Sequence, residues 1–336
     1  MRSLIPALTL SVLLLGCGAS PTPEGAQDGA PEPVLLVSQK GASSIAFYTL
    51  EGELLDETAV NQHPHEIVLS PDGKRLFTTD NGTMAIEIAG EGGHHVSIID
   101  VEAREKIGEI DLGEYHRPHG IALCADGKLL VTSENPDQLL ILDVEQKLIS
   151  RHYDTGGETP HIVQCSPDSQ TAYVSNARSR TVAFINLATG EKKLIETDDR
   201  PEGSVLSKDG SKLYVAHRDS DKVYALDTAT GQILGSFATG DEPVRIGLTG
   251  DEKTAVYGML GGRGVGIADL ETMEQVAVLE TEGLVSLEIA EDGVTATACA
   301  QDQDTCYVIS VPERKILHTV MVNEGAGPDP ALLLEM

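Results

Sequence analysis

The sequence predicts an all-β protein, a seven-bladed β-propeller in residues 34–336, and three observations carry this prediction. A short unit returns about every 42 residues along the chain. Each unit reads as four short strands separated by turns. The chain also begins inside one unit and ends with the strand that this unit lacks. Repeats of this kind are typical of propeller blades.

The period is measured on the aspartate of the turn that follows the first strand of each unit. These aspartates are Asp72, Asp126, Asp168, Asp209, Asp251 and Asp292. Their spacings are 54, 42, 41, 42 and 41, and the first spacing is one period plus an insertion of 12 residues. Regular spacing of this length predicts blades of equal size with one long loop.

Each unit has the same internal order. A first strand such as IVLS precedes an Asp-Gly type of turn, a second strand such as KLYVA follows, and a polar loop leads to a third strand such as VYALD. A further turn such as TATG leads to a fourth strand, QILGSFA. Alternating apolar residues joined by Asx-Gly turns are typical of β-hairpins. No stretch after residue 20 has a sustained helical period.

The two ends of the mature chain predict how the ring closes. The N-terminal segment VLLVSQKGASSIAFYTL aligns with KLYVAHRDSDKVYALDT, so the chain enters its first blade at the second strand. The missing first strand is PDPALLLEM at the C-terminus. We therefore expect the C-terminal strand to complete the N-terminal blade, which leaves no open sheet edge in the ring.

Three units carry a family resemblance: PHEIVLSPDGKRLFTTDNG, PHIVQCSPDSQTAYVSNARSRTVAFINLATGEKKL and PEGSVLSKDGSKLYVAHRDSDKVYALDTATGQILGSFATG. They resemble the YVTN-type repeats of seven-bladed propellers over essentially all of 34–336. The resemblance implies the fold. It leaves the function open, because the family includes surface and periplasmic proteins of unknown role, and more distant propellers include lactonases and antibiotic lyases. The WD40 class is excluded because the chain has no tryptophan.

The first 33 residues are predicted to be an export signal and a tether. Arg2 is followed by an apolar run, Leu4 to Leu15, which is too short to span a bilayer and suits a signal peptide. The run ends in Leu-Leu-Gly-Cys, which resembles a bacterial lipobox. The resemblance implies that residues 1–16 are removed, that Cys17 is lipidated, and that 17–33 form a flexible tether. Plain secretion with cleavage elsewhere is the alternative.

The charge excludes several classes of partner. The formal net charge is −29, from 53 acidic and 24 basic residues, and no basic patch is present in the sequence. Such a chain repels nucleic acid and anionic lipid. We expect an exported monomer that is lipid-anchored to the bacterial cell envelope, in the periplasm or at the cell surface. It should touch the membrane only through that anchor, and its partner should be a small molecule or protein at the propeller mouth. The scarcity of basic residues disfavours a sugar phosphate substrate.

One position of the repeat is rich in histidine. It lies seven residues before each turn aspartate, at the start of the innermost strand, where it should ring one mouth of the central channel. The occupants in ring order are Asp329, His65, His119, His161, Glu202, Val244 and Val285. The first five are expected to form one unbroken polar arc.

A second position agrees with the first. It lies eight residues after each aspartate, at the end of the second strand, and should ring the same mouth further out because paired strands are antiparallel. The occupants are Gln39, Asp80, Glu134, Asn176, His217, Met259 and Ala300. Both positions are polar in the same five blades and apolar in the same two, as is typical of a ligand site.

The polar arc predicts a metal site. Neutral imidazoles with a carboxylate are ligands for zinc, iron, copper or manganese, so we expect His65, His119, His161 and Asp329 to bind a divalent transition metal. Duplication of a Pro-His opening without any function is the alternative.

Further residues are predicted to orient the metal ligands, to contact the substrate or to transfer protons. Asp80, Glu134 and Asn176 are expected to orient the imidazoles, and the residues beside substrate or metal would be Asp80, Asn176, His217, Gln39 and Arg245. Arg245 would meet a ligand carboxylate or phosphate, or pair with Asp241 or Glu242. Glu202 or Glu134 would transfer protons.

The insertion lies between the second and third strands of its unit and reads NGTMAIEIAGEGGHHV. A long loop on a rigid scaffold is a frequent place for a lid. Its glycines allow a tight or mobile flap over the mouth, and we expect Glu87, His94 and His95 to reach inward.

Four cysteines follow Cys17, and no pair has CxxC spacing. Cys299 and Cys306 occupy matching positions on the two sides of one hairpin, so a cross-strand disulfide is predicted. Cys124 and Cys165 lie on adjacent inner strands one position out of step, and burial as free thiols is at least as favoured as a bridge.

Two functions remain open from the sequence. The first is a metal-dependent hydrolase or lyase acting on a small molecule. The alternative is a non-catalytic propeller that binds a ligand or a protein. No G-x-S-x-G motif is present, which disfavours a serine nucleophile.

Overall fold

The structure, a computed structural model, describes residues 1, 32–262 and 264–335. The predicted signal peptide, Cys17 and nearly all of the predicted tether lie outside these residues. Within them, no helix combines the length and the apolar character needed to cross a membrane.

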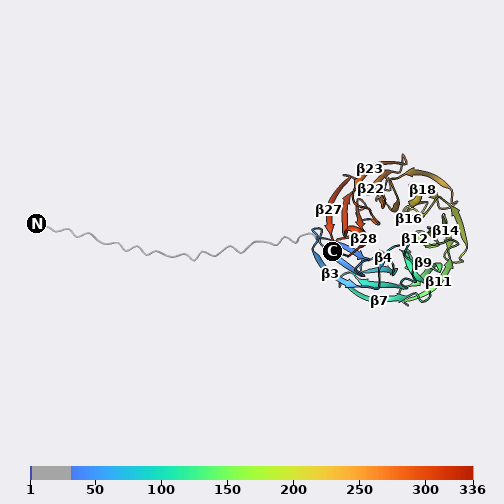
Figure 1. The fold of residues 1–336 in the computed structure, drawn as a ribbon, viewed down its shortest axis with the longest axis horizontal. Helices are drawn as coiled ribbons and strands as arrows, with labels where there is room; N and C mark the ends of the chain where they lie inside the picture. The colour runs from blue at the N-terminus through green and yellow to red at the C-terminus, as the bar shows by residue number, and fades with distance from the viewer. Residues whose placement is uncertain (2–31, 263, 336) are drawn as a thin grey trace.

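Seven four-stranded antiparallel sheets stand in a ring around a central channel, with β4, β12, β16 and β28 toward the centre and β3, β7 and β23 toward the rim (Figure 1). The predicted seven-bladed β-propeller is therefore confirmed. We number the blades along the chain, and each blade is given from its innermost strand outward.

The first three blades are built as follows. Blade 1 contains β28 (Pro328–Glu335), β1 (Pro33–Gln39), β2 (Ser44–Tyr48) and β3 (Leu54–Ala59). Blade 2 contains β4 (Pro64–Leu69), β5 (Arg75–Asp80), β6 (His95–Asp100) and β7 (Glu105–Asp111). Blade 3 contains β8 (His116–Leu123), β9 (Leu129–Asn135), β10 (Asp137–Asp143) and β11 (Leu148–Asp154).

The next two blades follow the same order. Blade 4 contains β12 (Pro160–Cys165), β13 (Thr171–Asn176), β14 (Thr181–Asn186) and β15 (Lys192–Glu196). Blade 5 contains β16 (Pro201–Leu206), β17 (Lys212–His217), the 3-10 turn η1 (Arg218–Ser220), β18 (Lys222–Asp227) and β19 (Ile233–Ala238).

The last two blades complete the ring. Blade 6 contains β20 (Pro243–Leu248), β21 (Thr254–Met259), β22 (Gly264–Asp269) and β23 (Glu274–Glu280). Blade 7 contains β24 (Ser286–Ile289), β25 (Thr295–Ala300), the 3-10 turn η2 (Gln301–Gln303), β26 (Thr305–Ser310) and β27 (Lys315–Met321).

The ring closes through the C-terminal strand, as predicted. Strand β28 pairs antiparallel with β1, from Pro33 opposite Glu335 to Gln39 opposite Pro328. Residues from both ends of the chain therefore share one sheet, and neither β1 nor β28 is left as a free edge on that side.

The recurrent turn aspartates have a local role. In four blades the aspartate accepts a hydrogen bond from a hydroxyl two residues earlier, at distances of 2.6–2.8 Å. These pairs are Ser70–Asp72, Ser166–Asp168, Ser207–Asp209 and Thr249–Asp251. In each pair the aspartate also accepts a backbone N–H two residues later, so one side chain closes the whole turn. Because these hydrogen bonds require an aspartate at one position of the turn, the aspartate recurs with the repeat in the sequence.

The apolar core is divided among the seven interfaces between blades. At the interface of blades 1 and 2, Leu36 and Phe47 pack with Leu76 and Ile99, and all four are buried. Six equivalent clusters lie at the other interfaces. Since burying one such side chain contributes about 1.5–3 kcal/mol, each blade depends on its two neighbours for stability.

Two disulfides connect the remaining cysteines. Cys299 and Cys306 are cross-strand partners of β25 and β26, so this predicted bridge is present. Cys124 and Cys165 also form a disulfide, with 5.5 Å between their Cα atoms, which settles the open alternative in favour of a bridge. This second bridge joins the inner strand region of blade 3 to that of blade 4.

The two bridges should differ in their contribution to stability. Loop closure predicts about 4 kcal/mol for the bridge that spans 41 residues and about 2 kcal/mol for the one that spans 7. We expect Cys124→Ser/Cys165→Ser to lower the urea midpoint more than Cys299→Ser/Cys306→Ser. An equal loss in both double variants would contradict the loop-length argument.

Candidate functional site

Five of the seven inner strands begin at the mouth with the same backbone arrangement. The residue before the first proline of the strand has a positive φ of 51–56° in five blades, a conformation that is uncommon outside glycine. These residues are His63, Arg117, Thr159, Arg200 and Glu242. The strand pairing then shifts register just after the proline. Side chains at the start of the strand therefore escape strict alternation and can face the channel.

The structure brings the predicted polar arc together. The ring centroids of His65 and His119 lie 4.0 Å apart, and those of His119 and His161 lie 3.8 Å apart. Asp329 lies beside His65 at one end of this row of imidazoles, with its Oδ2 atom 3.0 Å from Nδ1 of His65. The three imidazoles come from blades 2, 3 and 4 and are 2–6 % exposed. The arc is thus continuous across four neighbouring blades.

Bonds between blades hold the histidine backbone. Thr79 Oγ1 donates to the carbonyl of His119 at 2.8 Å, and Thr132 Oγ1 donates to the carbonyl of His161 at 2.7 Å. Gly120 follows His119, and a Cβ at this glycine would lie 2.2 Å from the carbonyl oxygen of His161. Only glycine permits this approach of the two inner strands, so it sets the spacing of the two imidazoles.

A chain of charge-assisted contacts orients His119. Its Nδ1 atom lies 2.6 Å from Oε1 of Glu134, and the other oxygen of Glu134 accepts from Nε of Arg117 at 2.7 Å. Burial raises the pKa of Glu134 to about 7, against the opposing effect of Arg117. The Nε2 atom of His119 is buried and has no hydrogen-bond partner among the residues that the structure describes. Glu134 thus fixes the orientation of the His119 imidazole, while Nε2 of that imidazole remains available to a ligand.

Asp329 and Lys40 form a buried ion pair beside His65. Lys40 Nζ lies 3.5 Å from Oδ2 of Asp329, and both side chains are almost fully buried. Burial alone would raise the pKa of Asp329, but His65 and Lys40 outweigh it and hold the pKa below its ordinary value. Asp329 is therefore an ionised carboxylate at neutral pH.

A second ion pair crosses the channel. Arg245 on β20 of blade 6 binds Glu66 on β4 of blade 2 through Nη2, and both side chains are buried. Arg245 pairs neither with Asp241 nor with Glu242 here. Glu288 lines the channel nearby, and burial, followed by the carboxylate of Glu66, raises its pKa to about 8. The cluster of Lys40, Arg245, Glu66 and Asp329 is consequently balanced in charge.

The pKa of each of the three imidazoles is lowered, which favours the neutral form. Burial is the largest cause of the lowered pKa in each, followed by Lys40 for His65, by His161 for His119 and by Arg245 for His161. A neutral imidazole keeps a lone pair, which is the form that ligates metals and accepts protons.

The second ring of predicted residues is buried as expected, but three of its members hold their own blades together. Oδ2 of Asp80 accepts from Asn61 and Ser97, while Asn176 donates to Thr181 and Gln39 to Tyr48. His217 Nδ1 lies 3.1 Å from the carbonyl of Val215. Among the described contacts, Glu134 is the one member that touches an imidazole of the arc, so the orienting role predicted for Asp80 and Asn176 is not what the structure shows. Asp80 and Asn176 occupy the same repeat position as Glu134, but their side chains are one methylene shorter and bond to Ser97 on β6 and Thr181 on β14 instead.

Glu202 ends the arc in a different environment. Its carboxylate accepts from Nε of Arg200 at 2.5 Å and lies 3.6 Å from Nη1 of Arg218. Both predicted proton-transfer residues, Glu202 and Glu134, are thus already bound to a guanidinium group.

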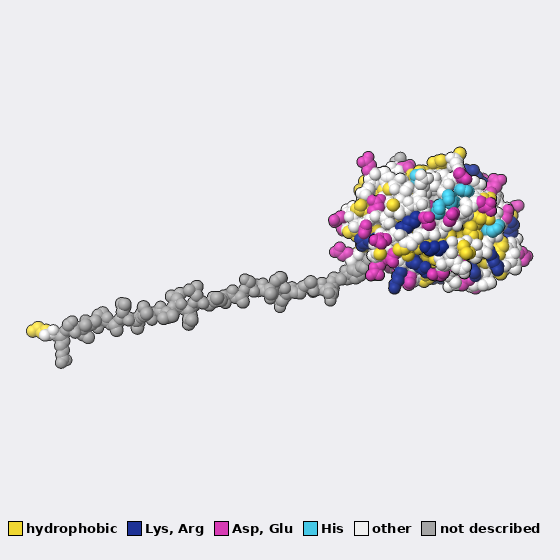
Figure 2. All heavy atoms as spheres, turned by 90° about the horizontal axis from the view of Figure 1, so that it is seen from below, with side chains coloured by type: hydrophobic (Ala, Val, Ile, Leu, Met, Phe, Trp, Pro, Cys, Tyr) yellow, Lys and Arg dark blue, Asp and Glu magenta, His cyan; other side chains and the backbone are white. Residues whose placement is uncertain are grey.

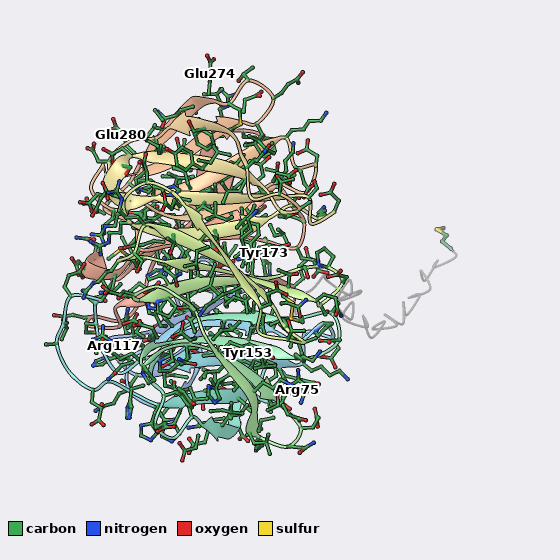
Figure 3. The ribbon with its side chains drawn as sticks, turned by 90° about the vertical axis from the view of Figure 1, so that its right-hand side faces the viewer. Arg75, Arg117, Tyr153, Tyr173, Glu274 and Glu280 are labelled. Atoms are coloured by element: carbon green, nitrogen blue, oxygen red, sulfur yellow. A yellow bond between two sulfur atoms is a disulfide. The ribbon has the colours of Figure 1, made fainter. Side chains whose placement is uncertain are left out.

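The flap, defined here as residues 81–94, lies over the mouth and is held by arginines. Arg117 donates to the carbonyls of Ile88 at 2.7 Å and Ile86 at 3.1 Å, and Arg178 donates to Ile86 at 3.3 Å. Glu87 is exposed, and its carboxylate lies 2.5 Å from Nη2 of Arg200. Figure 3 shows Arg117 at the face from which a blue-cyan loop stands out, with Arg75 near the opposite face.

Two expectations about this face are wrong. His94 and His95 do not reach inward; they adjoin Asp111 and Glu109 on the outermost strand, β7, because β6 begins at His95 and carries it away from the channel. The mouth is also not poor in basic groups. Six cations gather on or near it, namely Lys40, Arg117, Arg178, Arg200, Arg218 and Arg245.

Sequence reasoning missed Glu66 as a channel residue. Ideal alternation turns the residue after His65 away from the channel, whereas the register shift keeps it there. A signal was present, because this repeat position holds Glu66 in blade 2 and Arg245 in blade 6, which are opposite charges on inner strands. The ligating atoms of His65, His119 and Glu66 lie within 4.8 Å of one another.

Fold and channel together define the class of protein: a seven-bladed β-propeller with a charged, histidine-lined mouth. No protein-family model matches the chain, and no curated protein matches it. The YVTN resemblance therefore stays a prediction.

Solved structures do resemble the fold. One is titled hydrazine synthase of Kuenenia stuttgartiensis, with 20% identity, a TM-score of 0.71, and coverage of 87% of this chain and 99% of that chain. Another is the periplasmic gluconolactonase of Pseudomonas aeruginosa, with 16% identity, a TM-score of 0.71, and coverage of 90% and 99%. At these identities the likeness establishes the fold.

The buried carboxyl of Asp80 generates a pH prediction. Burial raises its pKa to about 7 in the folded state, against about 3.9 when unfolded. The stability from its proton is complete below pH 4 and is lost as pH rises through 7. Asp80→Asn keeps an acceptor for Asn61 and Ser97, so we expect it to match wild type at pH 4 and exceed it at pH 8, by on the order of 4 kcal/mol.

Urea unfolding at both pH values measures this difference. Asp209→Asn is the matched control, because hydrogen bonds from the Ser211 amide and the Ser207 hydroxyl hold the pKa of exposed Asp209 at about 2. Because Asp209 is ionised throughout this range, that variant should be less stable than wild type by about the same amount at pH 4 and at pH 8. A stability gain at pH 8 in both variants, or in neither, contradicts the assignment.

Proposed function

We propose that this protein is an extracytoplasmic propeller that binds a divalent transition metal at the histidine arc and uses it as a hydrolase or lyase on a small molecule. The observation that carries the proposal is the pairing of His119 with Glu134. A buried carboxylate at Nδ1 and an unpartnered, buried Nε2 form the arrangement in which ligating histidines are usually held.

The residues present fit such a metal in donor chemistry. His65, His119 and Glu66 offer two neutral imidazoles and a carboxylate whose ligating atoms already lie within 4.8 Å. His161 and Asp329 adjoin this set. Two imidazoles with a carboxylate suit zinc, iron, copper or manganese. Glu66 also binds Arg245, so ligation by Glu66 requires that this ion pair loosen.

A metal here would supply a Lewis acid that polarises a carbonyl or lowers the pKa of water. The chain's own residues would do the rest. Glu134 holds His119 in one tautomer, while Lys40 neutralises Asp329. Arg245 and the flap arginines would orient anionic or carbonyl oxygens of a substrate, and the flap excludes water from the channel. The gluconolactonase title of one fold neighbour makes neutral sugar lactones the first substrates to assay.

A non-catalytic binding propeller is the second candidate. It is favoured by the ion pairs that occupy Glu202 and Glu134, the two residues predicted to transfer protons. Metal binding without turnover of lactones or esters would support this candidate.

The metal is tested by elemental mass spectrometry of the purified protein without a polyhistidine tag. We expect the triple variant His65→Ala/His119→Ala/His161→Ala to lose about one equivalent of transition metal relative to wild type. The matched control His152→Ala/His318→Ala removes two histidines elsewhere and should lose none. Equal metal content in wild type and triple variant, after reconstitution with zinc, would refute the site.

The envelope location generates a separate prediction. We infer that Cys17 carries the lipid anchor, on the strength of the Leu-Leu-Gly-Cys sequence and the apolar run before it. Cys17→Ser should move the protein from the membrane fraction to the soluble fraction and abolish labelling with a fatty-acid analogue. Retention of the variant in the membrane fraction would contradict the anchor.

A further inference from the structure

A second group of histidines lies outside the channel. We propose that His94, His95 and Asp111, with His116 beside them, form a separate divalent transition-metal site at the base of the flap. The site lies toward the rim of blade 2, and nothing in the channel site depends on it.

The fold brings these four residues together from four segments. His94 ends the flap, His95 begins β6, and Asp111 ends β7 directly opposite His95 in the strand register. His116 begins β8 of the next blade. Figure 2 looks onto the side of the disc, where histidine side chains gather beside acidic ones.

The distances suit one ion. The ligating atoms of His94, His95 and Asp111 lie within 4.8 Å of one another, and Nε2 of His94 is 3.9 Å from Oδ1 of Asp111. The rings of His94 and His95 are 4.2 Å apart, and His94 and His116 are 5.3 Å apart, between centroids. Small side-chain rotations therefore suffice to bring three ligands to bonding distance.

Two observations show that the site is held in place. Gly113 N–H donates to Oδ1 of Asp111 at 2.8 Å, and Leu112 N–H donates to the carbonyl of His94 at 2.8 Å. These bonds fix the carboxylate and the backbone of one histidine before any ion arrives. Nδ1 of His116 is buried without a hydrogen-bond partner among the described residues, which is a cost that a ligand would remove.

The surrounding charge favours a cation. Glu109 lies 3.9 Å from Nε2 of His95, and Glu91 lies 3.4 Å from Nε2 of His116. These carboxylates, with Asp111, attract a divalent ion and accept the ring N–H groups that a metal leaves outward. Two or three imidazoles with a carboxylate select zinc or copper over magnesium or calcium.

An ion at this place would act on the flap. The two ends of the flap meet tightly, since Gly93 N–H donates to the carbonyl of Asn81 at 2.7 Å and a Cβ at Gly82 would lie 2.0 Å from the nitrogen of Gly93. The metal would link His94, which follows this junction, to Asp111 at the end of β7. It would thereby stiffen the base of the segment that covers the mouth.

The test uses the full chain, prepared without a polyhistidine tag, in the His65→Ala/His119→Ala/His161→Ala background, so that the channel histidines cannot contribute. Calorimetric titration with Zn²⁺ should show about one equivalent bound. Adding His94→Ala/His95→Ala should abolish this binding. Adding Asp111→Asn, at an exposed strand end where folding is not at stake, should weaken it about 10- to 100-fold.

The control adds His152→Ala/His318→Ala to the same background and should bind as the background does. Absence of Zn²⁺ binding in the background overturns the proposal. So does binding that survives both His94→Ala/His95→Ala and Asp111→Asn. Failure of the channel site gives a different pattern, because metal would then bind equally with and without the three channel histidines.

Discussion

The close approach of neighbouring inner strands is the constraint on which the rest of the structure depends. Each blade is too thin to bury its own apolar faces, so the seven interfaces supply the core. The threonine bonds from one blade to the next, and the absence of a side chain at Gly120, bring adjacent strands so close that neighbouring imidazole centroids lie 3.8–4.0 Å apart. The arc of His65, His119 and His161 is thus a direct product of the packing that stabilises the ring.

Much of the fold and the order of the arc could be read from the sequence. The turn aspartates mark a period because each closes a turn with a neighbouring hydroxyl, and that period assigns every residue to a place in a blade. Residues at one place in consecutive blades must be neighbours in a closed ring. For this reason, His65, His119 and His161 could be placed side by side without any structural information.

The rest of the site could not be predicted, because it depends on features that the alternation of strand residues does not encode. Glu66 faces the channel through a register shift that no pattern of alternation reveals. The pairing of Glu66 with Arg245 crosses the ring between residues 179 apart in sequence. The path of the flap depends on which arginines donate hydrogen bonds to its carbonyl groups. The periodicity of the strands gives no information about these long side-chain contacts. Glu134 was placed correctly because its strand end is fixed by the repeat.

The seam of the ring has a consequence for synthesis. Because β28 follows all the other strands in the chain, blade 1 lacks its innermost strand until the other six blades have been synthesised, and β1 presents an unpaired apolar edge until then. The other six blades consist of consecutive strands and can complete their sheets in the order in which they are synthesised, but the ring closes only when β28 pairs with β1. A truncation that removes β28 would therefore leave all the other strands in place and still expose the apolar edge of β1 to self-association.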